Sequence, residues 1–118
     1  MKNPKNLKYP VPDTAVKFDA EKLRFELISD AAEAGLAQVL TFGAKKYAAD
    51  NWRKGMEWRR VIGALKRHLH AFSCGEDIDP ESGLPHIDHA MCCVMFLSEY
   101  QKLQLGTDDR FKGVVKCD

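Results

Sequence analysis

Two long segments with helical periodicity, joined by a short acidic loop, constrain the fold of this chain most strongly. The first runs from Glu57 to about Cys74, and the second from Pro85 or His86 to about Leu105. A glycine follows the first segment, where helices favour it, and a proline opens the second, where it suits a first turn. Because a connection of about ten residues usually joins antiparallel neighbours, the sequence predicts a helical hairpin.

A third helical segment precedes the hairpin. It is predicted to run from Asp30 to about Tyr47, with Asp30 opening a capping box. The proline-rich stretch 1–27 is predicted to be an extended N-terminal arm that lies across the domain or across a partner subunit. Residues 28–105 then form the helical domain, and 106–118 a polar, loosely held tail. The expected fold is an all-α, compact antiparallel bundle of three main helices, completed in an oligomer.

Composition narrows the possible functions. With 118 residues, 45% of them hydrophobic, the chain is long enough for one soluble domain. A net charge of +1 provides no broad basic surface for duplex nucleic acid. The four cysteines lack the spacing of a disulfide framework and no secretory signal precedes them, which favours a cytoplasmic setting. The longest apolar run, Ala90 to Leu97, is too short to span a membrane.

All four histidines belong to the predicted hairpin, and three of them are expected to meet at one end of it. His68 shares the core-facing stripe of its helix, whereas His70 points elsewhere. His86 and His89 are neighbours on one face of the following helix. The three inward imidazoles therefore lie within about two helical turns of the end that the two helices share. The loop adds carboxylates at this end, from Glu76, Asp77, Asp79 and Glu81.

Imidazole and carboxylate side chains gathered in this way predict a site for a divalent metal ion. Such ligands favour manganese, zinc, iron or nickel, whereas a cage of carboxylates alone would suit magnesium. The expected metal ligands are His68, His86, His89 and Asp79. Asp79 lies midway through the loop and, with Glu76, is expected to be a catalytic carboxylate. The alternative is that the histidines are hydrogen-bonded core residues. The sequence contains none of the known metal motifs EF-hand, HExxH or paired CxxC.

Cations and aromatic side chains around the end of the first helix predict a nucleotide site. The stretch GAKKYAADNWRKG begins with lysines that a helix C-terminus attracts. A simple helix-ending turn explains these lysines but explains less well why Asn51 and Trp52 precede Arg53. In a nucleotide pocket, Trp52 would stack on the base and Asn51 would read its edge. The expected nucleotide-binding residues are Lys22, Arg24, Lys46, Tyr47, Asn51, Trp52 and Arg67.

Four segments between Lys17 and Tyr100 carry a family resemblance: KFDAEKLRFELI, VLTFGAKKYAADNW, RHLHAFSCGEDIDPESG and HIDHAMCC. In this combination and order, the chain resembles the phage-type dATP/dGTP diphosphohydrolase N-terminal domain family. That family is similar to the all-α NTP pyrophosphohydrolases (MazG-like). The matching positions are Lys22, Lys46, Tyr47, Asn51, Trp52, His68, Glu76, Asp79, His86 and His89.

The resemblance implies a usually oligomeric protein that hydrolyses dATP and dGTP to the monophosphate and pyrophosphate. Because a substrate buried at the end of a bundle often contacts a neighbouring subunit, we expect a homodimer or tetramer. It would act in the host cytoplasm with a divalent ion, either magnesium, manganese or another transition metal, that activates water. MazG-like enzymes carry an acidic ExxE…ExxD signature, whereas this chain has HIDH in place of ExxD and no preceding ExxE on the second helix. The alternatives are a nucleotide-binding protein without turnover and a helical interaction module.

Overall fold

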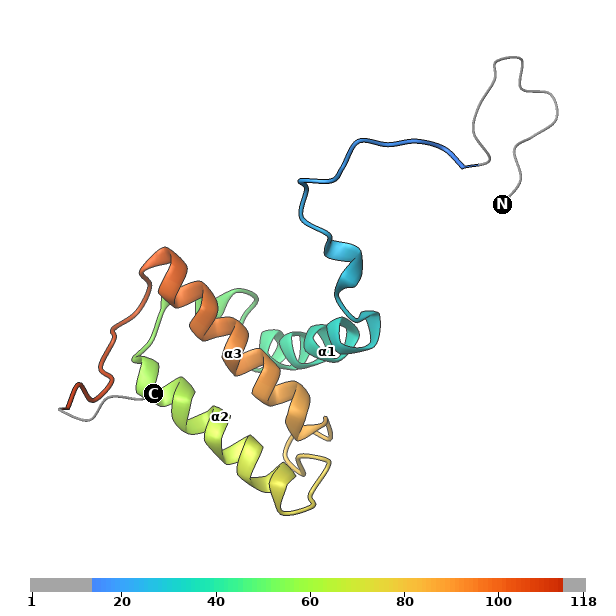
Figure 1. The fold of residues 1–118 in the computed structure, drawn as a ribbon. Coiled ribbons are helices and arrows are strands. Elements are labelled where there is room, and N and C mark those ends of the chain that lie inside the picture. The colour runs from blue at the N-terminus through green and yellow to red at the C-terminus, as the bar shows by residue number, and fades with distance from the viewer. Residues whose placement is uncertain (1–13, 114–118) are drawn as a thin grey trace.

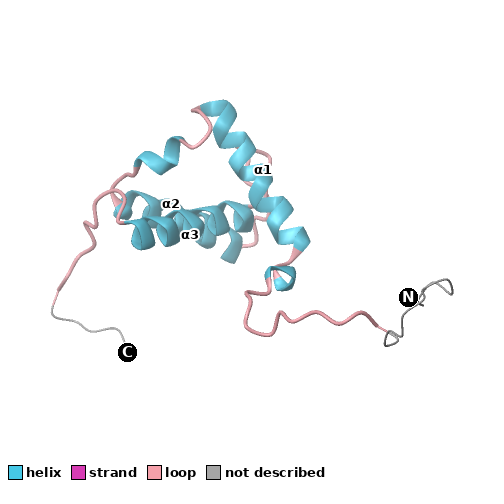
Figure 2. Cartoon of the chain, turned by 90° about the horizontal axis from the view of Figure 1, so that it is seen from above, coloured by secondary structure: helices cyan, strands magenta, loops and turns pink. Residues whose placement is uncertain are grey.

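The protein is an all-α bundle in which two antiparallel helices are crossed by a third. The structure, a computed structural model, describes residues 14–113. Its elements are η1 (Phe25–Leu27), α1 (Asp30–Lys46), η2 (Asn51–Lys54), α2 (Trp58–Ser73) and α3 (His86–Leu103), where η denotes a short 3₁₀ helix. Figure 1 shows α2 and α3 paired as a hairpin, and Figure 2 shows α1 lying across one side of that pair. The predicted all-α fold class and the hairpin are confirmed, and completion of the bundle in an oligomer stays a prediction.

The core lies between the facing stripes of α2 and α3. Its buried centre consists of Trp58, Val61, Cys93 and Tyr100, of which Tyr100 is fully enclosed, with 0% of its surface exposed. The Tyr100 hydroxyl donates a 2.7 Å hydrogen bond to the C=O of Trp52 in η2. A buried hydroxyl without a partner would lose its hydrogen bonds to water. This bond therefore holds η2 against the hairpin.

The N-terminal cap of α1 differs from the predicted capping box. Ser29, rather than Asp30, is the capping residue, and its hydroxyl accepts a 3.1 Å hydrogen bond from the N–H of Ala32. Serine and aspartate cap helices about equally well, so the sequence alone did not show which of Ser29 and Asp30 would be the capping residue. Asp30 lies instead in the first turn, where its negative charge favours the positive end of the helix.

α1 packs on α3 through a glycine. Gly35 and Val39 are the buried residues of α1. A side chain at Gly35 would collide with the carboxylate of Asp88 on α3, so the glycine allows the two helices to approach closely here. The other end of α1 leads through residues 47–50 into η2, which returns the chain to the hairpin.

The beginning of the predicted tail is held against α2, which corrects the expectation that this segment is loose. Thr107 and Asp109 accept hydrogen bonds of 3.0 and 2.9 Å from the first two backbone N–H groups of α2. These N–H groups have no partner inside the helix, so the tail satisfies them. Gly55 and Gly106, with φ angles of 87° and 70°, bring the two segments into backbone contact that a Cβ atom would block.

The described part of the arm, residues 14–27, leads away from the bundle, as Figure 1 shows. Its apolar side chains are exposed. The rest of the predicted arm and the last residues of the predicted tail, 114–118, lie outside the described residues. The division of the chain at residues 27/28 and 105/106 stays a prediction. Between residues 14 and 113, no helix has the length and apolar character needed to cross a membrane.

Removing the Tyr100 hydroxyl is expected to destabilise the fold. In Tyr100→Phe the C=O of Trp52 loses its donor, which costs about 1–3 kcal/mol of unfolding free energy. Tyr47→Phe is the matched control, because Tyr47 is 67% exposed and should tolerate the same change. Urea unfolding followed by circular dichroism measures both variants. Equal stability of the two variants would contradict the role assigned to this bond.

Candidate nucleotide and metal site

A cleft of about 850 Å³ lies between α1, η2 and the hairpin. Apolar side chains form part of its wall, including Val39, Phe42 and Phe96. A volume of this size lies within the usual range for small-molecule sites. The predicted site residues that line it are Lys46, Tyr47, Asn51, Trp52, Arg67, His68, Asp79, His86 and His89. The structure therefore brings most of the predicted nucleotide and metal residues to one cleft.

The three inward histidines meet, as the geometry of the hairpin predicts. Nδ1 of His68 lies 2.9 Å from Nδ1 of His86. The rings of His68 and His89 are stacked, with centroids 4.6 Å apart and planes 7° apart. His86 is buried and the other two are half-buried, whereas His70 is exposed on the outer side of α2. The expected convergence is confirmed, while the ligand roles of these side chains stay predictions.

Hydrogen-bond partners indicate which ring nitrogen of each histidine is the donor. Oε1 of Glu76 lies 2.6 Å from Nε2 of His86. An ionised carboxylate can only accept, so His86 donates from Nε2 and its Nδ1 carries a lone pair. His68 then donates from Nδ1 to that lone pair. Glu76 thus orients His86, although it does not itself line the cleft.

Ser82 organises the other half of the cluster. Its hydroxyl donates to Oδ2 of Asp79 at 3.0 Å and lies 2.6 Å from Nε2 of His89. Because the hydroxyl proton goes to Asp79, His89 must donate from Nε2 to the Ser82 oxygen. Our reading of the sequence missed this residue. The available signal was the Asp-Pro-Glu-Ser stretch, in which a serine shortly after an aspartate is typical of a tight turn.

Burial sets the charge state of the cluster. It lowers the pKa of the His68 and His89 imidazoles, so both rings are uncharged at neutral pH. Burial by itself would raise the pKa of Asp79, but hydrogen bonds from Ser82 and from the N–H of Glu81 outweigh it and lower that pKa. The cluster therefore combines the neutral imidazoles of His68 and His89 with the ionised carboxylate of Asp79.

The donors present fit a divalent ion in their chemistry, but they are not assembled into a complete ligand set. Two cis nitrogen ligands at about 2.1 Å from an octahedral ion lie about 3 Å apart, close to the 2.9 Å between Nδ1 of His68 and of His86. The contact from Glu76 to His86 matches the outer carboxylate that usually orients a ligating imidazole. Within residues 14–113, however, no group of three or more His, Cys, Asp or Glu side chains is arranged to hold a metal ion.

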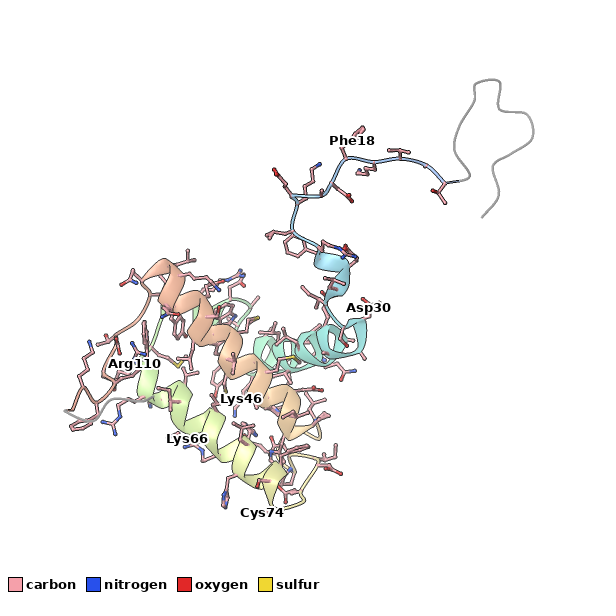
Figure 3. The ribbon with its side chains drawn as sticks, viewed as in Figure 1. Phe18, Asp30, Lys46, Lys66, Cys74 and Arg110 are labelled. Atoms are coloured by element: carbon pink, nitrogen blue, oxygen red, sulfur yellow. The ribbon has the colours of Figure 1, made fainter. Side chains whose placement is uncertain are left out.

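Lys46 and Trp52, which line the cleft, already have partners within the protein. Lys46, labelled in Figure 3, forms a 2.9 Å ion pair with Glu81, and this hydrogen bond raises the pKa of Lys46. The Trp52 ring is stacked on Phe96 at 4.5 Å, and the guanidinium of Arg53 lies 5.0 Å from its centroid. Packing against Phe96 and Arg53 therefore accounts for the position of the Trp52 ring. Stacking of this ring on a nucleotide base stays a prediction.

The arm does not reach the cleft in this structure. Lys22 and Arg24 are exposed and do not line it, and Arg24 pairs with Glu26 at 2.8 Å. Their predicted contact with nucleotide phosphates therefore has no support from the cleft of a single chain.

The fold and the cleft define an all-α protein with an imidazole-lined site. The chain belongs to the family described as dATP/dGTP diphosphohydrolase, N-terminal, which matches residues 12–110. It is 35% identical over 97 residues to a protein named dATP/dGTP diphosphohydrolase from Salmonella phage PMBT28. That alignment covers 82% of this chain and 33% of the relative, so the chain spans about a third of the relative's length. No solved structure matches this chain. The predicted family is confirmed.

The proton positions in the cluster can be measured directly. In protein treated with a chelator, long-range ¹H–¹⁵N NMR at neutral pH is expected to show His86 and His89 protonated at Nε2 and His68 at Nδ1. His70, which is exposed and lies outside the cluster, serves as the control. A proton at Nδ1 of His86 would contradict the hydrogen-bond network described above.

Proposed function

We propose that this chain acts in the hydrolysis of dATP and dGTP to the monophosphate and pyrophosphate, with a divalent metal ion. The observation that carries the proposal is the convergence of cationic, aromatic, amide and imidazole side chains on one cleft, in a chain of this family. The name of the phage relative supports the same substrates.

The rim of the cleft would bind the nucleotide. Lys46 can leave Glu81 for a triphosphate, because a phosphate group offers it more negative charge than one exposed carboxylate. Arg67 also lines the cleft and takes part in none of the ion pairs found among residues 14–113, so its fork of donors is available to phosphate oxygens. Tyr47 and Asn51 would contact the base, with the exposed Tyr47 ring as the stacking surface.

The imidazole cluster would hold the ion and position the water. His68 and His86 would bind the metal through Nδ1, with His89 and Asp79 as the further predicted ligands. A bound ion stabilises charge on the phosphates and lowers the pKa of water. Glu76 fixes the orientation of His86, and Ser82 fixes Asp79. Asp79 is ionised, so it can accept the proton as water attacks the α-phosphorus and pyrophosphate leaves.

A second candidate is nucleotide binding without turnover. One observation favours it: no set of three metal donors is assembled in residues 14–113. In that case the cleft would sequester a purine deoxynucleotide, and the histidines would act as structural hydrogen-bond partners.

An assay of products distinguishes these functions. Purified protein with Mg²⁺ or Mn²⁺ is expected to convert dATP and dGTP to equal amounts of monophosphate and pyrophosphate, followed by anion-exchange chromatography. Chelation should abolish the reaction. The double variant His86→Ala/His89→Ala is expected to lose about 100-fold or more in rate, because it removes two proposed ligands. His70→Ala is the matched control. Tight binding without products would favour sequestration, and full activity of a folded double variant would exclude the proposed ligands.

Lys46 is expected to contribute to binding more than to the chemical step. A charged hydrogen bond is worth about 1.5–3 kcal/mol, so Lys46→Gln should weaken dATP binding about tenfold or more. Lys45→Gln is the control, since Lys45 is exposed and does not line the cleft. Isothermal titration calorimetry without metal measures both, and equal affinities would remove Lys46 from the site.

A further inference from the structure

The arm carries an apolar surface that nothing in residues 14–113 covers. Its exposed large side chains are Val16, Phe18, Leu23, Phe25 and Leu27. Phe18 is 91% exposed and Phe25 71%, and Figure 3 shows Phe18 on the arm, away from the helices. Isolated exposed apolar residues are ordinary, but a run of this kind marks an interaction surface. The arm therefore lacks a partner in the single chain.

Helix α3 carries a second uncovered apolar surface. Its stripe of His89, Cys93 and Tyr100 faces the site and the core, whereas Val94 points outward and is 52% exposed. A shallow groove of about 560 Å³ runs along this outer face. Its lining includes Met91, Val94, Met95 and Leu103, and Glu99 and Lys102 border it. The methionines can adapt their shape to an incoming side chain.

The two surfaces match in character. The groove is apolar, with one acid and one base at its border. The arm places apolar side chains between alternating charges in the stretch KFDAEKLRFEL. A net charge of +1 opposes self-association only weakly. The described part of the arm leads away from its own bundle (Figure 1), and none of residues 14–27 lines the groove.

The area that could be buried is sufficient for a stable dimer. An aromatic side chain buries about 150 Å² or more. Two exchanged arms, each with two aromatic and three aliphatic side chains, would therefore bury on the order of 1,200 Å², at the lower end of ordinary specific interfaces.

We propose that two copies of this chain associate by exchanging arms, with the arm of each copy docked in the outer groove of α3 of the other. The proposal does not depend on nucleotide hydrolysis. Arm exchange would nevertheless affect the nucleotide and metal cleft, because Met95 lines both the groove and the cleft. An arm seated in the groove would support one wall of the cleft.

Single substitutions test each surface of the full chain. Wild-type protein is expected to have twice the monomer mass by size-exclusion chromatography with light scattering. Phe25→Asp on the arm and Val94→Asp in the groove should each give monomers, with unchanged circular dichroism. Phe111→Asp is the matched control, because Phe111 is 86% exposed but belongs to neither surface, and it should stay dimeric.

Mixing the two variants tests the exchange itself. The Phe25→Asp chain keeps its groove and the Val94→Asp chain keeps its arm, so an equimolar mixture should regain part of the dimer. A mixture that stays monomeric would overturn the proposal. So would a wild-type chain that is monomeric at every concentration, as expected if the arm packs on its own bundle or on another protein. A dimer that survives both substitutions would place the interface elsewhere and would also overturn it.

Discussion

The antiparallel packing of α2 on α3 is the constraint on which the rest of the structure depends. A single face of α3 forms the apolar core around Tyr100 and Cys93 and then continues, toward the acidic loop, into His89 and His86. The same burial has different consequences at the two ends. Around Tyr100 it stabilises the fold by removing apolar surface from water. Around the histidines it disfavours charge, which lowers the pKa of His68 and His89 and leaves neutral rings that can donate or accept hydrogen bonds or bind an ion.

The polar groups of the site satisfy one another. Every fully buried side-chain nitrogen or oxygen in residues 14–113 has a hydrogen-bond partner. An ion bound by His68 and His86 must therefore displace the proton between their Nδ1 atoms, and a phosphate bound by Lys46 must displace Glu81. Binding is an exchange of partners, so its net free energy is smaller than the contacts in the complex would suggest. The Lys46–Glu81 pair is exposed to solvent, and such pairs are worth little, which makes it the easier of the two to replace.

Local patterns predicted the parts of the protein that local physics controls. Loop length and periodicity were sufficient to predict the hairpin and to predict that His68 faces the core while His70 is exposed. The cap of α1 was misplaced by one residue because Ser29 and Asp30 are both good caps. The contact of Thr107 with α2, the stacking of Trp52 on Phe96 and the pairing of Lys46 with Glu81 join residues far apart in sequence. Each of these side chains had several plausible partners, and only the tertiary arrangement selects one.

The imidazoles also bear on which ion and which substrate would suit the proposed site. An acidic ExxE…ExxD signature would place carboxylates where this chain has His86 and His89. Carboxylates neutralise the charge of a divalent ion, whereas neutral imidazoles leave it in place. An ion held mainly by His68 and His86 would therefore attract a triphosphate more strongly than one held by several carboxylates. It would also favour manganese, zinc or nickel over magnesium, which binds imidazole poorly. The substrate phosphates would then supply the negative oxygen ligands that the protein does not, so metal and nucleotide would bind cooperatively, each weakly without the other.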